Sequence, residues 1–183
     1  MNKEELIALI DEGRNFEYLF FLSHKEKTLG ILDEACLSQW YPSPFIIQKN
    51  KQKLVMPTAE HYMMYSKAML FKDFKRAKQI LETKEPREVL HLGRRVQNFD
   101  ENIWRALAYT IVVEGNLAKF SQNPKLQSYL LATKDKVLVE ASKKNKTWGI
   151  GLLAEDKNTP NPKKWLGKNQ LGFALMQVRA LLG

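Results

Sequence analysis

Residues 100–120 read DENIWRALAYTIVVEGNLAKF and form the longest helical pattern in this chain of 183 residues. Asp100 has a side chain suited to cap the first turn of a helix. The apolar residues that follow recur at helical spacing and share one face: Ile103, Trp104, Leu107, Ile111 and Val112. The pattern predicts the central core helix of the fold, which reaches Glu114 and extends toward Phe120.

Further helices are expected on both sides of this segment. Thr58 can cap a helix that runs to about Phe71, and Asp73 can cap a second helix through Leu81. Pro86 suits the first turn of a third helix, which we expect to end before Gly93. After the central helix, residues 124–133 and 168–182 have helical patterns too. Most of the chain is therefore expected to be helical.

The N-terminal residues 3–13 carry Leu6, Ile7 and Ile10 at helical spacing. They predict a short amphipathic helix that packs either on the main body or on a partner. We therefore divide the chain into an N-terminal helix or extension over residues 1–15 and one domain over residues 16–183.

A few short strands complete the predicted fold. Residues 18–22 are a compact aromatic and aliphatic run, and residues 45–56 follow a proline-rich stretch and predict a hairpin with a lysine-rich tip. Residues 137–139 are a β-branched strand that delivers Glu140 at its end. The predicted fold class is mainly α, a single multihelical domain with a few short β-strands.

Composition limits the class of protein. With 44% hydrophobic and 27% charged residues the chain is typical of a globular protein. Its apolar stretches, such as residues 106–113, are shorter than the 18 or so residues of a membrane span. The first 12 residues include four acidic side chains, unlike a secretory signal. We expect a cytoplasmic protein with no membrane partner.

The chain offers no obvious metal site. Its single cysteine, Cys36, reads as a small buried side chain, and His24, His61 and His91 lie far apart in sequence. The net charge of +9 favours anionic partners such as phosphates, and it leaves nucleic acid open as a partner.

Glu60 and Lys67 are the first candidates for chemistry, because they lie seven residues apart in one helix and share a face. Met63 and Met64 share that surface, so it mixes apolar and ionisable side chains. The alternative is that Glu60 only complements the helix N-terminus and that Lys67 reaches out to solvent.

Seven segments together resemble the NADAR, or YbiA-like, family over about residues 18–182, in the family's order. The segments are Leu37-Ser38-Gln39-Trp40-Tyr41-Pro42-Ser43-Pro44-Phe45, Ala59 to Ala68, Leu92-Gly93-Arg94-Arg95-Val96, Gly115-Asn116-Leu117-Ala118-Lys119-Phe120, Leu138 to Ser142, Trp148-Gly149-Ile150-Gly151, and Trp165 to Gly172 followed by Leu175 to Arg179. The resemblance implies a mainly helical domain of YbiA-like type with N-glycosidase activity.

The resemblance also implies a class of substrate. Substrates in the family include phosphoribosylamino-pyrimidine intermediates of riboflavin synthesis, and some members remove ADP-ribose from guanine. The expected function is hydrolysis of the ribose–nitrogen bond of such a phosphorylated, nucleotide-like substrate. The resemblance implies no metal or organic cofactor.

The chemistry of that bond can be matched to particular residues. Cleavage leaves positive charge at the anomeric carbon and needs an acid to protonate the leaving nitrogen. Glu60 is the first choice for the carboxylate, and Lys67 is the candidate amine nucleophile for a Schiff base with the opened sugar. Glu140 is a candidate second carboxylate, with a buried salt bridge to Arg94, Arg95 or Arg179 as the equal alternative.

Other residues are candidates for substrate binding. Trp40, Trp104 and Trp148 offer flat faces for a base, although Trp104 also fits simple core packing. Arg94 and Lys119 can contact a phosphate or ribose, and for Lys119 a solvated helix end is the equal alternative.

Two positions depart from the family pattern. Asn145 stands where the family usually has an aspartate, three residues before the Trp, and an amide can hold a ribose hydroxyl but cannot act as a base. Residues 21–24, which end at His24, lack the Trp-Gly pair that many family members have before this His. Together with the net charge, Asn145 supports the alternative of a catalytically weak nucleotide- or nucleic-acid-binding module in a stress or defence system.

Overall fold

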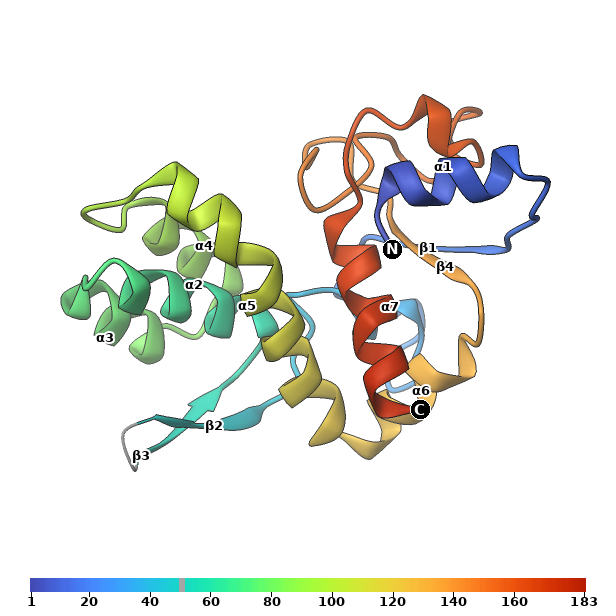
Figure 1. The fold of residues 1–183 in the computed structure, drawn as a ribbon. Helices are drawn as coiled ribbons and strands as arrows, with labels where there is room; N and C mark the ends of the chain where they lie inside the picture. Colours follow the sequence, from blue (N-terminus) through green and yellow to red (C-terminus); the bar gives the residue numbers. More distant parts are fainter. Residues whose placement is uncertain (50–51) are drawn as a thin grey trace. The chain divides into compact units, whose positions relative to one another are not determined.

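The computed structural model describes residues 1–49 and 52–183, and they are mainly helical with a few short strands, as predicted (Figure 1). The elements in chain order are α1 (Lys3–Asp11), β1 (Tyr18–Phe21), the 3₁₀ helix η1 (Glu34–Leu37), β2 (Phe45–Lys49), β3 (Gln52–Met56), α2 (Ala59–Leu70), α3 (Phe74–Glu82), α4 (Pro86–Arg94), α5 (Glu101–Ser121), α6 (Pro124–Ala132), β4 (Val137–Glu140), the 3₁₀ helix η2 (Pro162–Lys164) and α7 (Gln170–Leu182).

The chain forms two compact units, which we describe separately. The helical unit comprises Gln39–Pro124 and holds the hairpin and helices α2 to α5. The terminal unit comprises Met1–Ser38 and Lys125–Gly183.

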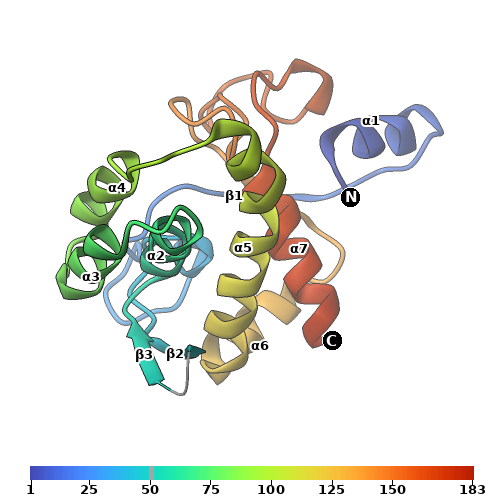
Figure 2. The same cartoon turned by 60° about the vertical axis from the view of Figure 1, so that its left-hand side comes forward.

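Helix α2 is the centre of the helical unit, with α3 and α4 on one side of it and α5 on the other (Figure 2). Glycines allow two of these helices to approach α2 closely. A Cβ at Gly93 in α4 would overlap the Met64 sulfur, and a Cβ at Gly115 in α5 would overlap the Tyr62 ring. Helix α4 therefore continues through Gly93 to Arg94, and the expectation that it ends before this glycine is wrong.

The central helix α5 exists as predicted, but its buried face shares only Val112 with the predicted face. Ile103 and Leu107 are 46% and 40% exposed. The buried residues of the helix are Ala108, Val112, Val113, Gly115, Asn116, Lys119 and Phe120. This face includes small and polar residues such as Gly115, which permits a close approach to α2. The apolar periodicity at the start of the helix therefore did not identify most of the core face.

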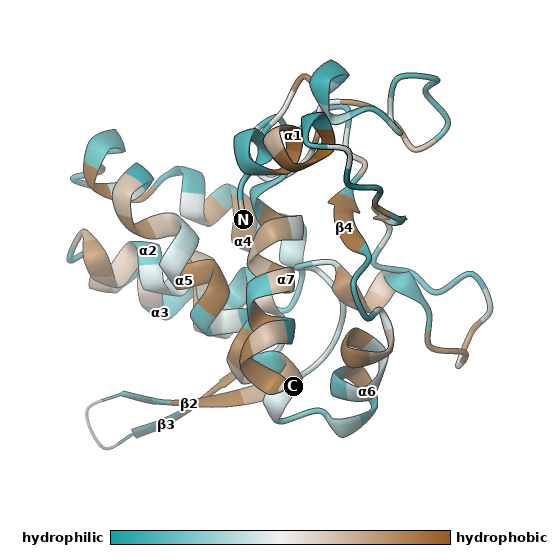
Figure 3. Ribbon diagram, turned by 45° about the vertical axis from the view of Figure 1, so that its right-hand side comes forward, coloured by the Kyte–Doolittle hydropathy of each residue, from teal (hydrophilic) through white to brown (hydrophobic). Residues whose placement is uncertain are grey.

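The hairpin of β2 and β3 pairs Phe45 with Met56 at its base, where both side chains are buried. Figure 3 shows the strands apolar at this base and polar farther out. The Gln122 side chain bonds the backbone N–H and C=O of Ile46, at 2.8 and 2.9 Å, and so occupies part of the outer edge of β2. The tip predicted at Asn50 and Lys51 lies outside the described residues.

In the terminal unit, β1 pairs in parallel with β4, and α7 packs on β4. Asn169 has a positive φ of 54°, and its side chain bonds Leu138 O and Glu140 N. Helix α7 therefore starts at Gln170, two residues later than expected. Helix α1 packs within the same unit: Leu6 is fully buried, and Lys3 Nζ donates to Trp165 O at 2.7 Å.

Among residues 1–49 and 52–183, no helix is both long and apolar enough to cross a membrane.

Candidate functional site

Glu60 lies in the first turn of α2 and is almost fully buried, with 5% of its surface exposed. Thr58 caps this helix, and the backbone N–H of Glu60 donates to Gln39 O at 3.0 Å, which fixes the start of α2 against the preceding segment. Burial raises the pKa of the Glu60 carboxyl to about 7, although a hydrogen bond from Trp40 and the charge of Arg94 oppose this rise. A carboxyl with such a pKa can both donate and accept a proton near neutral pH.

Lys67 lies two turns further along α2 and is also buried, with 9% of its surface exposed. Its ammonium is 4.1 Å from the centre of the Phe99 ring and 5.3 Å from that of Trp104. Burial lowers the pKa of Lys67, and Arg94 lowers it further. A buried amine with a lowered pKa is the form that acts as a nucleophile. The alternative in which Lys67 reaches out to solvent is therefore wrong.

The charge of Arg94 affects both Glu60 and Lys67. This arginine is the last residue of α4 and is exposed, and its charge acts on both the Glu60 carboxyl and the Lys67 amine. An exposed guanidinium beside two buried ionisable groups is suited to bind a phosphate from solution.

Two of the predicted tryptophans lie at this site. Trp40 is half-buried and bonds Glu60, and Trp104 is half-buried beside Lys67. Trp104 is therefore not a simple core residue, although the sequence pattern favoured that role. The structure thus brings together Trp40, Glu60, Lys67, Arg94 and Trp104, all within the helical unit.

A buried polar group adjoins this set, and the sequence patterns did not single it out. Asn116 in α5 is fully buried and donates to Gln39 Oε1 and Val112 O, each at 2.8 Å. The same Gln39 accepts the Glu60 backbone N–H through its carbonyl. Asn116 therefore helps to place the start of α2. A polar residue on the buried stripe of the central helix was the signal that could have identified it.

Lys119 is fully buried, so the alternative of a solvated helix end is wrong. Its ammonium lies 5.0 Å from the centre of the Phe120 ring and 5.8 Å from that of Tyr41. Contact of Lys119 with a phosphate stays a prediction.

His61 has a structural role. Its ring is fully buried, with Nδ1 2.8 Å from Thr58 Oγ1 and Nε2 3.0 Å from Thr83 O. The carbonyl requires a proton on Nε2, and a neutral ring then has an unprotonated Nδ1 that accepts from the Thr58 hydroxyl. Burial lowers its pKa, in agreement with this state.

Glu140, Asn145 and Trp148 lie in the terminal unit, the first at the end of β4 and the other two in the loop that follows it. Glu140 ends β4, and its carbonyl accepts from Ile150 N. Asn145 Oδ1 accepts the backbone N–H groups of Thr147 and Trp148 at 3.3 and 3.0 Å, which orders the turn before the half-buried Trp148. Their catalytic and binding roles stay predictions.

Arg179, one predicted partner of Glu140, donates to Thr133 Oγ1 and Lys136 O at 2.7 and 2.9 Å. These bonds attach α7 to the segment before β4, so Arg179 has a structural role there.

A hollow of about 480 Å³ lies beside a neighbouring face of α2, lined by residues that include Tyr62, Ser66, Leu107 and Glu114. Tyr62 donates to Glu114 there at 3.1 Å. Neither Glu60 nor Lys67 lines this hollow. Within the described part of the chain, no cluster of three or more His, Cys, Asp or Glu side chains could hold a metal ion.

Comparison with known proteins identifies the family. The model of the NADAR domain matches residues 20–183, a range that spans both units. A protein of Acanthamoeba polyphaga mimivirus named N-glycosidase R617 is 42% identical over 164 residues, 89% of this chain and 95% of that protein. The maize protein named Riboflavin biosynthesis protein PYRR, chloroplastic, is 33% identical over 149 residues, 75% of this chain and 22% of that protein.

The Escherichia coli protein named N-glycosidase YbiA is 30% identical over 126 residues, 69% of this chain and 70% of that protein. Its NMR structure matches with a TM-score of 0.69 and 25% identity, covering 92% of this chain and 86% of that one. The fold is thus of YbiA type, and the names of the relatives agree with the expected hydrolysis of N-glycosidic bonds. The extent of the match to the family model and the identity to the viral protein show that this chain belongs to the NADAR family.

Proposed function

We propose that this protein is an N-glycosidase that hydrolyses the ribose–nitrogen bond of a phosphorylated, nucleotide-like substrate. The single observation that carries the proposal is the face of α2, where a buried carboxyl with a pKa near 7 and a buried amine with a lowered pKa lie beside one exposed arginine. Relatives with N-glycosidase names support the same reaction.

Each residue has a distinct part in the proposed reaction. Arg94 binds the phosphate, which places the sugar over α2. Glu60 donates its proton to the leaving nitrogen, and its carboxylate then balances the positive charge on the sugar. Trp40 and Trp104 supply flat surfaces for the base or the sugar.

Lys67 completes the reaction in its neutral form. The C1–O4 bond of the ribose first opens, and O4 takes the proton that the glycosidic nitrogen gives up, so that C1 becomes an imine. The Lys67 nitrogen attacks C1 of this imine, the C1 bond to the base nitrogen breaks, and the base departs as a free amine with one proton from the lysine and one from Glu60. The sugar is left as a Schiff base on Lys67. Water then adds to C1 and releases the phosphorylated sugar, which restores the lysine amine.

The proposed substrate is a phosphoribosylamino-pyrimidine of the kind formed in riboflavin synthesis, with ADP-ribosylated guanine as the second substrate to test. The name of the maize relative supports the first. The exposed position of Arg94 suits the terminal phosphate of the first substrate and the diphosphate of the second.

Product analysis tests the proposal. The protein is incubated separately with each substrate, with the Glu60→Gln variant as the control. Mass spectrometry follows the free base and the released sugar, which is a sugar phosphate from the pyrimidine substrate and ADP-ribose from the guanine one. We expect release of base by the wild type on at least one substrate and a loss of roughly 10²–10⁴-fold in the variant, the usual contribution of a general acid. Binding of both substrates without release of base would support the binding module.

A further inference from the structure

The Phe99 ring that covers Lys67 lies in an irregular segment between α4 and α5, so it needs anchors outside the helices. Its position matters, because the ring centre is 4.1 Å from Lys67 Nζ and 5.3 Å from the ring centre of Phe71 at the end of α2. Phe99 itself is 44% exposed, so one side of the ring faces solvent and the other faces the amine.

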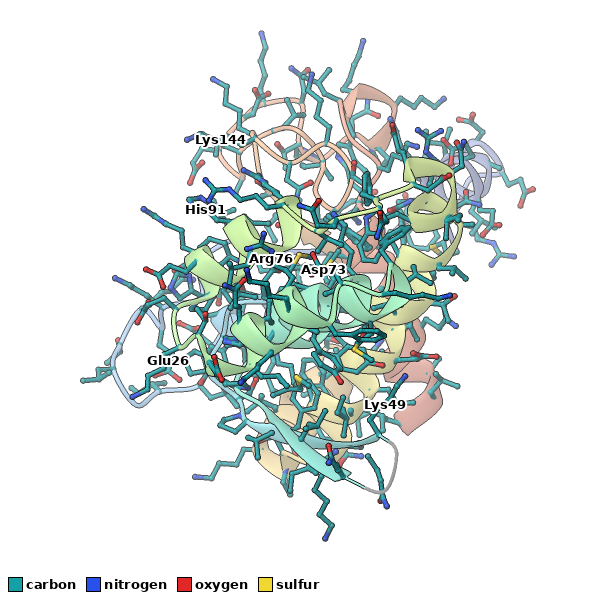
Figure 4. All side chains as sticks on the ribbon, turned by 90° about the vertical axis from the view of Figure 1, so that its left-hand side faces the viewer. Glu26, Lys49, Asp73, Arg76, His91 and Lys144 are labelled. Atoms are coloured by element: carbon teal, nitrogen blue, oxygen red, sulfur yellow. The ribbon has the colours of Figure 1, made fainter. Side chains whose placement is uncertain are left out.

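One anchor of this segment is Asp73, the residue that caps α3. One carboxylate oxygen, Oδ1, accepts the backbone N–H of Arg76 at 3.0 Å and closes the first turn of α3. The other oxygen, Oδ2, accepts the backbone N–H of Gln97 at 2.9 Å. The Asp73 side chain is only 8% exposed, and Figure 4 labels it beside Arg76 in this unit.

The backbone of Asp73 is also bonded to α2, the helix that carries the candidate site. Its N–H donates to Ala68 O at 2.9 Å, one residue after Lys67. Asp73 is therefore bonded both to the end of α2, which carries Lys67, and to the segment that carries Phe99. The second anchor of that segment is Asp100, whose Oδ1 caps α5.

We propose that Asp73 is a positioning residue: by holding the backbone of Gln97 it keeps the Phe99 ring over the Lys67 amine and keeps water from that amine. The inference rests on the proposed nucleophilic role of Lys67. The hydrogen bond from the Gln97 backbone N–H is the largest cause of the lowered pKa of Asp73, so the Asp73 carboxylate makes this bond at neutral pH.

The sign of the expected effect separates positioning from direct electrostatics. The charged groups that act on these two side chains are Arg94 on Lys67, and Arg76 and Lys75 on Asp73. Removal of the negative charge at Asp73, with nothing moved, would lower the pKa of Lys67 or leave it unchanged. Release of Phe99 would admit water and raise that pKa, because hydration of an ammonium outweighs the loss of one ring contact.

The test uses Asp73→Asn, whose Oδ1 still caps α3 while the amide NH₂ cannot accept the Gln97 N–H. The lysines of the protein are dimethylated with ¹³C, and NMR follows the pKa of Lys67, whose signal is assigned by its absence in Lys67→Arg. We expect the pKa of Lys67 to rise by about one unit. The fraction of Lys67 in the neutral form near pH 7 then falls roughly tenfold. In the matched control, Asp100→Asn, one charge is lost beside Phe99 but the capping Oδ1 is kept, and the pKa should not rise.

A second pair of variants shows whether Asp73 acts through the ring. Phe99→Leu alone should raise the pKa of Lys67, and Asp73→Asn added to it should change that pKa no further. An unchanged or lowered pKa in Asp73→Asn, or an equal further rise in the double variant, overturns the inference. If the NMR shifts appear as expected but the wild type cleaves neither substrate, the proposed function fails and the positioning role of Asp73 stands.

Discussion

The substitution Glu60→Gln should make the protein more stable at alkaline pH while it removes activity. Glu60 is buried, and its pKa in the folded state is raised from 4.5 to about 7. The folded protein therefore binds this proton more tightly than the unfolded chain does. The free energy of unfolding is reduced as pH rises from about 4.5 to about 7, and above that range the full cost of ionisation is present.

The size of this cost follows from the shift in pKa. A rise of this extent corresponds to about 3 kcal/mol, of which the neutral glutamine should recover about 1–3 kcal/mol once the lost charge opposite Arg94 is allowed for. The amide oxygen can still accept the hydrogen bond from Trp40. For a chain of this size the thermal midpoint should rise by roughly 2–10 °C at pH 8 and change little at pH 4.

The assay is chemical and thermal unfolding of the wild type and Glu60→Gln at several values of pH between 4 and 9. Glu155→Gln is the control, because Glu155 is exposed on a loop of the terminal unit. A difference between wild type and Glu60→Gln that stays constant over this pH range would refute the argument, since it would mean that no buried carboxylate ionises at this position.

Three further predictions concern other parts of the molecule. Gly93→Ala should destabilise the fold by about 1–3 kcal/mol in urea unfolding, because the new methyl group overlaps the Met64 sulfur; an unchanged midpoint would show that α4 does not approach α2 so closely. Lys67→Met should abolish release of base while the urea midpoint stays equal or rises, since a buried amine is replaced by an apolar side chain; turnover near that of the wild type would exclude the lysine from the reaction. Asn145→Asp should keep the fold and change turnover by less than about tenfold, because its Oδ1 still accepts the Thr147 and Trp148 N–H groups; a gain above a hundredfold in turnover with unchanged substrate binding would favour the binding module.

The helices could be predicted from the sequence because their ends carry strong local signals. Thr58, Asp73 and Asp100 cap α2, α3 and α5 as expected, each with its side-chain oxygen on a backbone N–H. Where tertiary packing competes with a local signal, the prediction failed. Gly93 ends a helix by propensity, yet it lies within α4, where it packs so closely on α2 that a Cβ would overlap the Met64 side chain.

The candidate site could be predicted only in part. The seven-residue spacing of Glu60 and Lys67 placed both on one face of α2. Arg94 was indicated as a charged donor after the break at Gly93, and the tryptophans by their flat faces. The pattern could not show that both ionisable groups are buried, because burial depends on α4, α5 and the segment of Phe99. Asp73 gave a signal for a helix cap and none for its bond to Gln97, which joins residues 24 positions apart.

The most direct test of the central claim is reductive trapping during turnover. The protein is mixed with a phosphoribosylamino-pyrimidine, and separately with ADP-ribosylated guanosine, in the presence of borohydride, and peptide mass spectrometry locates any adduct. We predict one reduced adduct on Lys67, a sugar phosphate from the first substrate or ADP-ribose from the second. Activity should be lost in proportion to the adduct, and Lys67→Met should carry no adduct. An enzyme that releases the base at its full rate with borohydride present and carries no adduct would contradict the account and indicate direct attack by water.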